Sequence, residues 1–367
     1  MKKERRYDLD WIRVIAFDLL ILYHVGMFFV PWPWHIKNNI TSEGFVIPMM
    51  FLNQWRLPLL FVLSGMGTCY ALSYKTGNIF IKERAFRLVI PLIFGMLILV
   101  PPQVYVERLS QGVAYQSYFD FYTYLFNGTY PKGNLSWHHL WFIFYLFFYT
   151  LLLTPVFIYI RNSPKIKPFE WLHRSLQKHP FAILLFPIPL IIIESILYPK
   201  FGYKLSFWQD WYALSFYGVL FFYGFILISL KDTFWDLLEK YRFHFFILAL
   251  LFMAIFFVLF QTNHESLVYV PRVYSLWCWI LLLIGYSAKY LNKPSALLAY
   301  RNEAVYPFYI LHHTVLLILG FYIANLNLSI ALKFLILVIG TFGIVWIIYE
   351  LLIRRYKVFR FLFGMKF

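Results

Sequence analysis

Long apolar stretches recur along the whole chain, and they limit its fold more than any other feature. Hydrophobic residues make up 61% of the 367 residues, whereas charged residues make up only 14%. A helix of about 20 apolar residues is long enough to cross the hydrocarbon core of a bilayer. Soluble domains do not need this much apolar surface, and the runs are helical in length rather than short and alternating. We therefore expect an all-α, polytopic transmembrane helix bundle.

Hydropathy predicts about ten membrane spans, and positive charges predict their orientation. The predicted spans cover residues 11–31, 46–72, 88–106, 140–160, 180–198, 211–230, 243–261, 271–289, 304–325 and 331–353. With a cytoplasmic N-terminus, 25 of the 33 Lys and Arg residues fall in the inner segments 1–13, 73–87, 161–179, 231–242, 289–303 and 354–367. Because Lys and Arg concentrate on the cytoplasmic side, both termini are predicted to be cytoplasmic. Residues 231–242 are expected to form a short helix on the inner membrane surface.

The net charge of +16 is interpreted in the same way. In a soluble protein such a charge would indicate a nucleic-acid partner. Here Lys and Arg orient the spans and meet anionic lipid headgroups, so membrane lipids are the expected partners and nucleic acid is not. No segment is long enough for a second domain. Residues 1–367 are therefore expected to form a single transmembrane domain without an appended soluble domain, and the oligomeric state stays open.

The first predicted span is unusually polar, because it contains Arg13, Asp18 and His24 and follows Asp10 directly. A charged residue at the centre of a span costs roughly 2.5–3.5 kcal/mol, so such groups point to function. Eleven residues, close to three helical turns, place Arg13 and His24 on one face, roughly 16 Å apart along the axis. Asp18 points away from that face, so its partner is expected on another helix. His24 is suited to taking and returning a proton near neutral pH, although a histidine bonded between helices is the alternative.

Two arginines stand at the inner end of the third predicted span. Arg84 and Arg87 are three residues apart, so their guanidinium groups project from adjoining faces of one helical turn. Guanidinium groups bind phosphate oxygens through paired hydrogen bonds, which favours a phosphate site. An ordinary positive anchor on the cytoplasmic side explains the pair equally well.

The ninth predicted span carries a third group of polar residues: Glu303, Tyr306, Tyr309, His312 and His313. Tyr306, Tyr309 and His313 share one helical face, and Glu303 lies near the cytoplasmic end. A proton relay, a substrate clamp and a packing contact are all compatible with this pattern. Adjacent histidines diverge by about 100° on a helix, so chelation of a metal by His312 and His313 is not expected.

Aromatic and polar residues also cluster on the predicted outer side. Trp34 and His35 follow the first span, and Trp141 opens the fourth after His138 and His139. Aromatic rings beside polar groups are suited to holding a sugar, but the interfacial aromatic belt of membrane proteins explains most of them as well. Loop 107–139, the longest connection, is expected to form a structured cap or lid.

Five motifs in chain order resemble the integral-membrane acyltransferase-3 family. They are Leu9-Asp10-x-x-Arg13 with His24, Phe61-Val-Leu-Ser64-Gly65, Arg84-x-x-Arg87, His139-Leu-Trp141-Phe, and Glu303-x-x-Tyr-x-x-Tyr-x-x-His312. The resemblance runs from residue 6 to about 364. Further details are similar to a branch of the family associated with succinylation of osmoregulated periplasmic glucans: Trp34-His35, Arg56, His312-His313, and the tail Tyr349-Glu350 with Phe361-Leu-Phe-Gly364.

The resemblance implies a reaction that joins the two sides of the membrane. Acyl-CoA would dock from the cytoplasm with its phosphates near Arg84, Arg87 and Arg13, and its pantetheine arm is comparable in length to the separation of Arg13 from His24. His24 would act as general base on the acceptor hydroxyl, with acylation of His24 itself as the alternative. One carboxylate, Asp10, Asp18 or Glu303, would orient a polar partner. Because a thioester is already activated, we expect neither a metal nor a tightly bound cofactor; acyl-CoA is a co-substrate.

The predicted function is transfer of an acetyl- or succinyl-class group from acyl-CoA to a hydroxyl of an extracytoplasmic carbohydrate, such as an envelope glucan, by a protein of the cytoplasmic membrane. The predicted catalytic residues are His24, Arg13 and Asp10. The predicted substrate contacts are Trp34, His35, Arg56, Trp141, Glu303, Tyr309 and His313, and Arg56 is assigned to the carboxylate of a succinyl donor. The alternatives are a secondary transporter of a small polar or anionic solute, which would also bury charges, and a membrane scaffold without catalysis.

Overall fold

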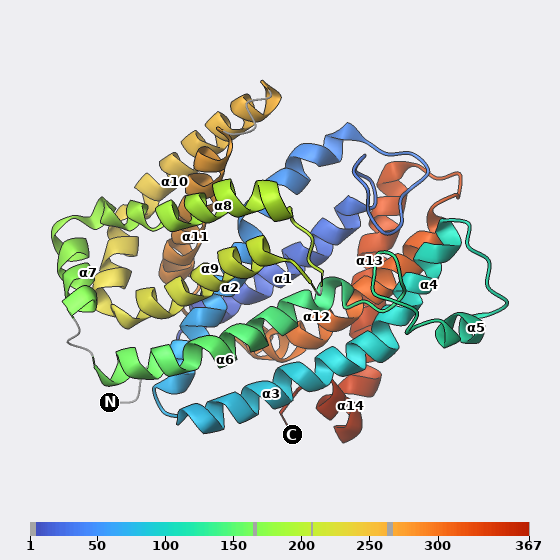
Figure 1. Cartoon of the computed structure of the whole chain (residues 1–367), viewed down its shortest axis with the longest axis horizontal. Coiled ribbons are helices and arrows are strands. Elements are labelled where there is room, and N and C mark those ends of the chain that lie inside the picture. Colours follow the sequence, from blue (N-terminus) through green and yellow to red (C-terminus); the bar gives the residue numbers. More distant parts are fainter. Residues whose placement is uncertain (1–4, 164–166, 207, 263–266, 367) are drawn as a thin grey trace. The chain divides into compact units, whose positions relative to one another are not determined.

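The protein was analysed as a computed structural model that describes residues 5–163, 167–206, 208–262 and 267–366. Within these ranges every regular element is a helix, and the isolated bridge between Thr129 and Leu135 is the sole β-type pairing. Figure 1 shows the helices in chain order. This confirms the predicted all-α class.

Nine helical segments in the described part of the chain are long and apolar enough to cross a membrane, and each matches one predicted span. They are Glu43–Leu72, Gly77–Ser110, His138–Asn162, Pro180–Phe201, Trp211–Ser229, Asp232–Gln261, Tyr269–Tyr290, Ala296–Ile323 and Ile330–Ile353. The remaining predicted span corresponds to α1 (Tyr7–Met27), which has 21 residues but carries Asp10, Arg13 and Asp18. The multi-pass architecture is therefore confirmed.

Several of these segments contain more than one element. The second span comprises η1 (Glu43–Phe45) and α2 (Val46–Leu72), and the third comprises α3 (Gly77–Phe94), the π-helical η2 (Gly95–Leu99) and α4 (Val100–Ser110). The other elements are α5 (Tyr118–Thr123), η3 (His138–Leu140), α6 (Trp141–Asn162), α7 (Lys167–Lys178), η4 (Pro180–Leu185), α8 (Pro187–Phe201), α9 (Trp211–Ser229), α10 (Asp232–Gln261), α11 (Tyr269–Tyr290), α12 (Ala296–Ile323), α13 (Ile330–Ile348), η5 (Tyr349–Ile353) and α14 (Lys357–Leu362).

Three predicted boundaries are wrong, and one of them is the start of α12 at Ala296, within the predicted inner segment 289–303. The predicted separate surface helix at residues 231–242 is instead the first part of α10, which runs without a break from Asp232 to Gln261. No Gly or Pro interrupts these residues, and extending a helix costs far less than starting a new one. For the same reason the third span begins at Gly77, within the predicted inner segment 73–87. Residues 1–4, 164–166 and 367 of the predicted inner segments lie outside the described residues.

The chain divides into two compact units, each assembled from separate stretches of sequence. Unit 1 comprises Met1–Ala16, Gln54–Lys82 and Phe148–Leu298, and unit 2 comprises Phe17–Asn53, Glu83–Phe147 and Ala299–Phe367. Several helices, α1 among them, contribute residues to both units.

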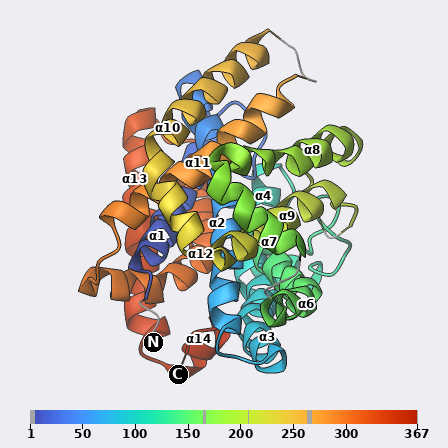
Figure 2. The same ribbon diagram turned by 90° about the vertical axis from the view of Figure 1, so that its left-hand side faces the viewer.

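In unit 1, α2 and α9 approach each other through two glycines. A Cβ atom on Gly65 would lie 1.9 Å from the carbonyl oxygen of Phe221, and one on Gly224 would lie 2.0 Å from that of Val62. The ring of Phe61 stacks on Tyr217 at 4.5 Å between centroids. The Phe61–Gly65 motif is therefore a helix-packing element of a kind that small residues make possible within membranes. In the same unit, α10 and α11 run side by side (Figures 1 and 2).

In unit 2, a buried apolar cluster joins the last turns of α1 to α4, α12 and α13. Its members are Val25, Phe28, Phe29, Ile36, Val106, Leu316, Leu317, Ile323, Ala324 and Leu337. Side chains from four helices interdigitate here, so the end of α1 and the loop that follows it are held against α4 and α12. This arrangement brings together polar residues that lie far apart in the sequence.

Candidate active site

Six of the ten histidines of the chain lie together in unit 2. They come from four segments: α1, the loop after it, η3 and α12. The six are His24, His35, His138, His139, His312 and His313. Neighbouring rings have centroids between 4.3 Å (His35 and His138) and 6.1 Å (His138 and His313) apart. Burying a polar ring is costly unless its nitrogens are hydrogen-bonded. The partner of each ring nitrogen shows whether that nitrogen donates or accepts, and therefore which nitrogen carries the proton.

The neighbours of His312 determine which ring donates the hydrogen bond between His24 and His312. His312 Nδ1 lies 2.7 Å from the backbone oxygen of Tyr309, which only accepts, so this nitrogen carries a proton. In the neutral ring Nε2 is then the acceptor, and His24 Nδ1, 2.8 Å away, donates to it. The two rings are nearly parallel, with 8° between their planes. In its neutral form the ring of His24 therefore carries its proton on Nδ1.

Gln103 of α4 orients two further histidines. Its amide nitrogen donates to Thr314 Oγ1 at 2.8 Å and to the backbone oxygen of Leu99 at 3.1 Å. Its amide oxygen therefore faces the imidazoles, 2.7 Å from Nδ1 of His313 and 3.0 Å from Nδ1 of His138. Both histidines donate through Nδ1, so in their neutral forms Nε2 of each ring carries the lone pair.

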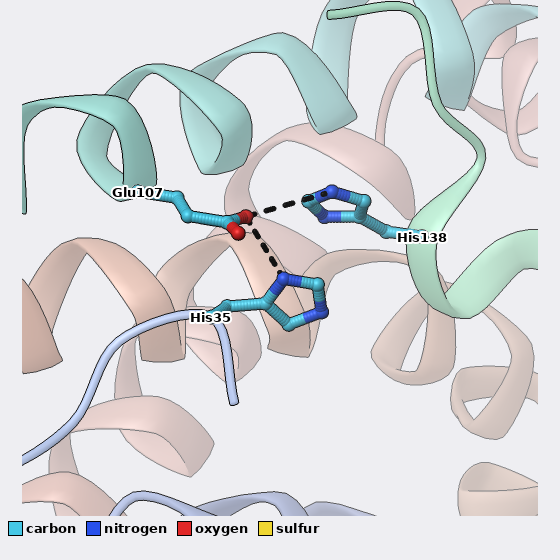
Figure 3. Close-up of side chains that lie close together, drawn as sticks. All are labelled: His35, Glu107 and His138. Carbon is cyan, nitrogen blue, oxygen red and sulfur yellow. Dashed lines mark hydrogen bonds and ion pairs between the residues drawn. The ribbon is translucent and has the colours of Figure 1, made fainter. Parts of the chain in front are cut away.

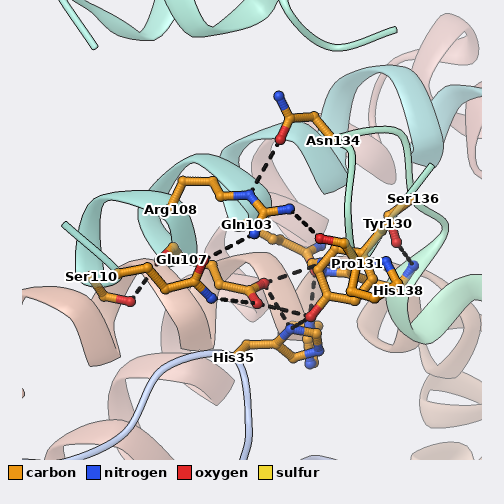
Figure 4. A network of polar contacts seen from close by, with 12 residues as sticks. His35, Gln103, Glu107, Arg108, Ser110, Tyr130, Pro131, Asn134, Ser136 and His138 are labelled. Atoms are coloured by element: carbon orange, nitrogen blue, oxygen red, sulfur yellow. Dashed lines mark hydrogen bonds and ion pairs between the residues drawn. The ribbon is translucent and has the colours of Figure 1, made fainter. Parts of the chain in front are cut away.

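Glu107, one turn after Gln103, is the centre of a second set of contacts (Figures 3 and 4). Its Oε2 lies 2.9 Å from His35 Nδ1, and its Oε1 accepts a hydrogen bond of 2.8 Å from the hydroxyl of Tyr130. Burial and the adjacent Glu107 carboxylate raise the pKa of Tyr130 well above its usual value, so the phenol stays protonated and donates. Arg108 donates to the carbonyl oxygens of Pro131 and Gly133, which ties this part of the connection between α4 and η3 to α4.

Two of the predicted substrate residues, Trp34 and His313, contact the ring of His24, and His35 and Tyr309 lie in the same cluster. Trp34 stands over its ring with 6.2 Å between centroids and meets the ring of His313 edge-on at 5.6 Å. His35 and His313 belong to the cluster, and Tyr309 donates its hydroxyl to the backbone oxygen of His139. The structure therefore brings these residues together with the predicted base.

Asp10 and Asp18, two of the three carboxylates of α1, each bind an arginine. Asp10 accepts from Arg13 of the same helix at 2.6 Å. Asp18 forms an ion pair with Arg301 of α12, which confirms that its partner belongs to another helix. Both aspartates thus orient guanidinium groups.

Arg87, one of the phosphate-binding candidates, lies next to the C-terminal segment of unit 2. Arg87 donates through Nε to the backbone oxygen of Gly364 at 3.3 Å, and its own backbone oxygen accepts from Tyr306 at 3.1 Å. The side chain of Arg87 is exposed, whereas that of Arg84 is half-buried.

The other predicted substrate residues have different surroundings. Glu303 binds Arg360 of α14 at 2.9 Å. Trp141, the first residue of α6, is buried against Tyr145, with 5.1 Å between ring centroids. Arg56 is fully buried in unit 1.

The sequence interpretation missed several residues that shape the site. They are Gln103, Glu107, Tyr130, Arg301 and His312 as the direct partner of His24. His138 and His139 were noticed beside the fourth span but were not assigned to the site. A signal for two of the missed residues existed: Gln103 and Glu107 are four residues apart near the outer end of an apolar span, a spacing that places both on one helical face. Glu107 was instead assigned to the start of the outer loop.

The fold and the site together define a multi-pass membrane protein with a buried, hydrogen-bonded histidine cluster suited to proton transfer. The chain matches the family described as "Acyltransferase domain" over residues 6–350. It therefore belongs to this acyltransferase-3 family, as its motifs predicted, and it is a membrane acyltransferase.

Curated relatives extend this result. Glucans biosynthesis protein C of Escherichia coli O1:K1 is 26% identical to the chain over 379 residues, which cover 99% of the chain and 95% of the relative. The protein of the same name from Escherichia coli strain K12 is 26% identical over 384 residues, with the same coverage. No solved structure matches the chain significantly.

Proposed function

We propose that this protein transfers an acetyl- or succinyl-class group from cytoplasmic acyl-CoA to a hydroxyl of an extracytoplasmic carbohydrate, with a glucan as the favoured acceptor. Membership of the acyltransferase family supports acyl transfer over the alternative of solute transport. The name of the relatives, glucans biosynthesis protein C, supports the glucan. The cytoplasmic membrane is the one that separates such a donor from such an acceptor.

One observation carries the chemistry: the hydrogen bond of 2.8 Å between His24 and His312. A general base needs a lone pair on one nitrogen and a partner that holds the ring in the correct tautomer on the other. His312, itself oriented by the Tyr309 carbonyl, is that partner. His24 Nε2 is then the base.

The reaction balances with this single base. His24 Nε2 takes the proton of the acceptor hydroxyl while the hydroxyl oxygen attacks the thioester carbonyl. The new C–O ester bond forms, the C–S bond breaks, and the proton passes from His24 to the departing sulfur of CoA. The donated Nδ1–H bond to His312 favours the imidazolium that exists between these steps.

The arginines provide the donor site in this proposal. Arg84 and Arg87 bind the phosphates of CoA through charge-assisted hydrogen bonds. Arg13, held by Asp10, is a further phosphate contact. Trp34 provides an apolar ring face for the sugar next to His24. His35 and His313 supply polar contacts to the sugar. The remaining predicted substrate residues keep their roles: Arg56, Trp141, Glu303 and Tyr309.

Reconstitution tests the proposal. Purified protein in liposomes receives acetyl-CoA or succinyl-CoA on one side and β-glucan oligosaccharides on the other, and mass spectrometry detects the acylated glucan. We expect ester formation with the wild type. For His24→Gln we expect a loss of about 10²- to 10⁴-fold, the usual contribution of a general base.

His244→Gln is the matched control, because this histidine is exposed on α10 in unit 1. It should transfer at the wild-type rate. Transfer by His24→Gln at the rate of the control would refute the role of His24. Solute uptake without any acylated product would favour the transporter instead.

A further inference from the structure

His35, Glu107 and His138 converge from three segments that are distant in the sequence. His35 belongs to the loop after α1, Glu107 to the last turns of α4, and His138 to η3. Their atoms Nδ1, Oε2 and Nε2 all lie within 4.8 Å of one another. Figure 3 shows both imidazoles facing the same carboxylate. The catalytic step proposed above uses none of these three atoms.

The Nε2 atom of His138 is the unexplained group in this arrangement. The side chain of His138 is fully buried, and this nitrogen has no hydrogen-bond partner. Because Nδ1 donates to Gln103, Nε2 of the neutral ring is a lone pair. It faces Glu107 Oε2 at 3.9 Å, and this oxygen carries lone pairs as well. Two buried acceptors that face each other require a cation or a donor between them.

We propose that these three residues form a binding site for a divalent transition metal ion, with Zn²⁺ as the best match. Two imidazoles and one carboxylate form a donor set that Zn²⁺ uses in proteins, and the fourth position stays open for water or a hydroxyl. The Tyr130 hydroxyl, 3.4 Å from His35 Nδ1, is near that position. No metal is expected from the sequence, because the adjacent His312 and His313 diverge on a helix and because a thioester is already activated.

The distances fit this ion after small shifts. Tetrahedral ligands about 2.0–2.2 Å from Zn²⁺ lie roughly 3.3 Å from one another. The separations from Glu107 Oε2, 2.9 Å to His35 Nδ1 and 3.9 Å to His138 Nε2, lie on either side of this value. His35 can coordinate through Nδ1 if its proton moves from Nδ1 to Nε2. This change of tautomer leaves the ring neutral, and no proton has to leave the side chain.

The residues around the three ligands have the arrangement of an outer shell. A metal-bound histidine usually donates its other N–H to an oxygen, as His138 does to Gln103. A metal-bound carboxylate is usually hydrogen-bonded as well, and Tyr130 bonds Oε1 of Glu107, which leaves Oε2 for the metal. Arg108 is the nearest arginine in sequence, and its guanidinium group donates to the carbonyl oxygen of Pro131 (Figure 4) and to that of Gly133.

A metal at this site would fasten three outer segments of unit 2 to one another. It would thereby fix the loop that carries Trp34 beside His24. Metal content and metal-dependent stability therefore test the site independently of acyl transfer.

Zinc binding is measured on full-length protein in detergent. The protein is stripped with a chelator, incubated with Zn²⁺, desalted, and assayed for metal by mass spectrometry. We expect about one Zn²⁺ per chain for the wild type and less than about 0.1 for Glu107→Gln and His138→Gln. Co²⁺ loading should give the visible absorption of a low-symmetry four- or five-coordinate site in the wild type only.

His139→Gln is the matched control, because His139 is equally buried but its Nε2 bonds the backbone oxygen of Ile310. It should bind zinc like the wild type. Glu107→Gln keeps one acceptor oxygen for the Tyr130 hydroxyl but replaces the oxygen that accepts from His35 by an amide nitrogen, which only donates. Equal melting temperatures without metal show that this variant folds. A wild type without zinc after loading, or zinc retained by either ligand variant, overturns the proposal.

Discussion

His24 Nδ1 lies 2.8 Å from His312 Nε2, and the Tyr309 carbonyl fixes the proton on the far nitrogen of His312. The protein thus holds the tautomer of the half-buried His24 with a second histidine, whereas many enzymes use a carboxylate for this purpose. Each of the three carboxylates that were candidates for this task binds an arginine instead.

The first prediction concerns His312 as a positioning residue. Replacing it by Leu removes the acceptor of His24 Nδ1–H, so the ring loses its fixed orientation. We expect kcat to fall about 10- to 100-fold while KM for acyl-CoA stays unchanged, since the interaction affects only the chemical step. His312→Gln places an amide near the position of Nε2 and should restore most of the rate. Equal rates for the Leu and Gln variants would argue against an orienting hydrogen bond.

The second prediction concerns the donor site. Arg84→Ala and Arg87→Ala should each weaken CoA binding about 10-fold or more, because a hydrogen bond to a charged group contributes about 1.5–3 kcal/mol. Isothermal titration with CoA measures this effect. Lys82→Ala, which removes an exposed cation from the same helix, should bind CoA like the wild type. If all three variants bind equally, the arginines are anchors on the cytoplasmic side.

The third prediction separates packing from catalysis in the Phe61–Gly65 motif. Gly65→Ala would place a methyl group 1.9 Å from the Phe221 oxygen, so α2 and α9 must move apart. We expect a loss of about 1–3 kcal/mol in stability, the usual cost of overpacking. Gly67→Ala is the control, because nothing lies within 4 Å of its added Cβ atom. Thermal unfolding in detergent measures both variants, and an unchanged melting temperature for Gly65→Ala would contradict the observed contact.

The fourth prediction is a pH dependence at Lys37. Burial lowers the pKa of Lys37 from 10.5 to about 8, and its ammonium group donates to the backbone oxygens of Met27 and Val30. At pH 8 about half of its amines are therefore neutral and nucleophilic, against ~0.3% for a lysine of ordinary pKa. The rate of acetylation should rise with pH and level off above about pH 9.

Peptide mass spectrometry of cells treated with a membrane-impermeant acetylating reagent measures this rate. Lys132, an exposed lysine of the predicted outer loop, is the comparison. A rate at Lys37 that keeps rising in parallel with Lys132 up to pH 10.5 would show that burial does not lower its pKa. Protection of both lysines in intact cells would contradict the predicted orientation of the spans.

The membrane spans were predictable from the sequence because what a helix needs in order to cross a bilayer depends only on its own residues. Each segment must satisfy its own backbone hydrogen bonds inside a helix and must be apolar over about 20 residues. The predicted spans therefore match helices one for one, including the polar α1. Only boundaries were missed, as at Asp232 and Gly77, where helices continue past the apolar stretch.

The site was predictable only in part. An ionisable residue within a span is visible in the sequence, so Asp18 and His24 were identified there, as were the motifs that carry the family resemblance. Helical geometry also predicted that Asp18 needs a partner on another helix. It did not identify Arg301, because which helices are neighbours depends on packing between distant segments.

Tertiary structure alone decided what each histidine does. His312 and His313 are adjacent, but only the packing of α12 determines that His312 meets His24 while His313 meets Gln103. The convergence of His35, Glu107 and His138 likewise depends on how the ends of α1, α4 and η3 meet. Local sequence determines which segments enter the membrane, whereas the direction of a hydrogen bond between segments depends on atoms that only the folded bundle brings together.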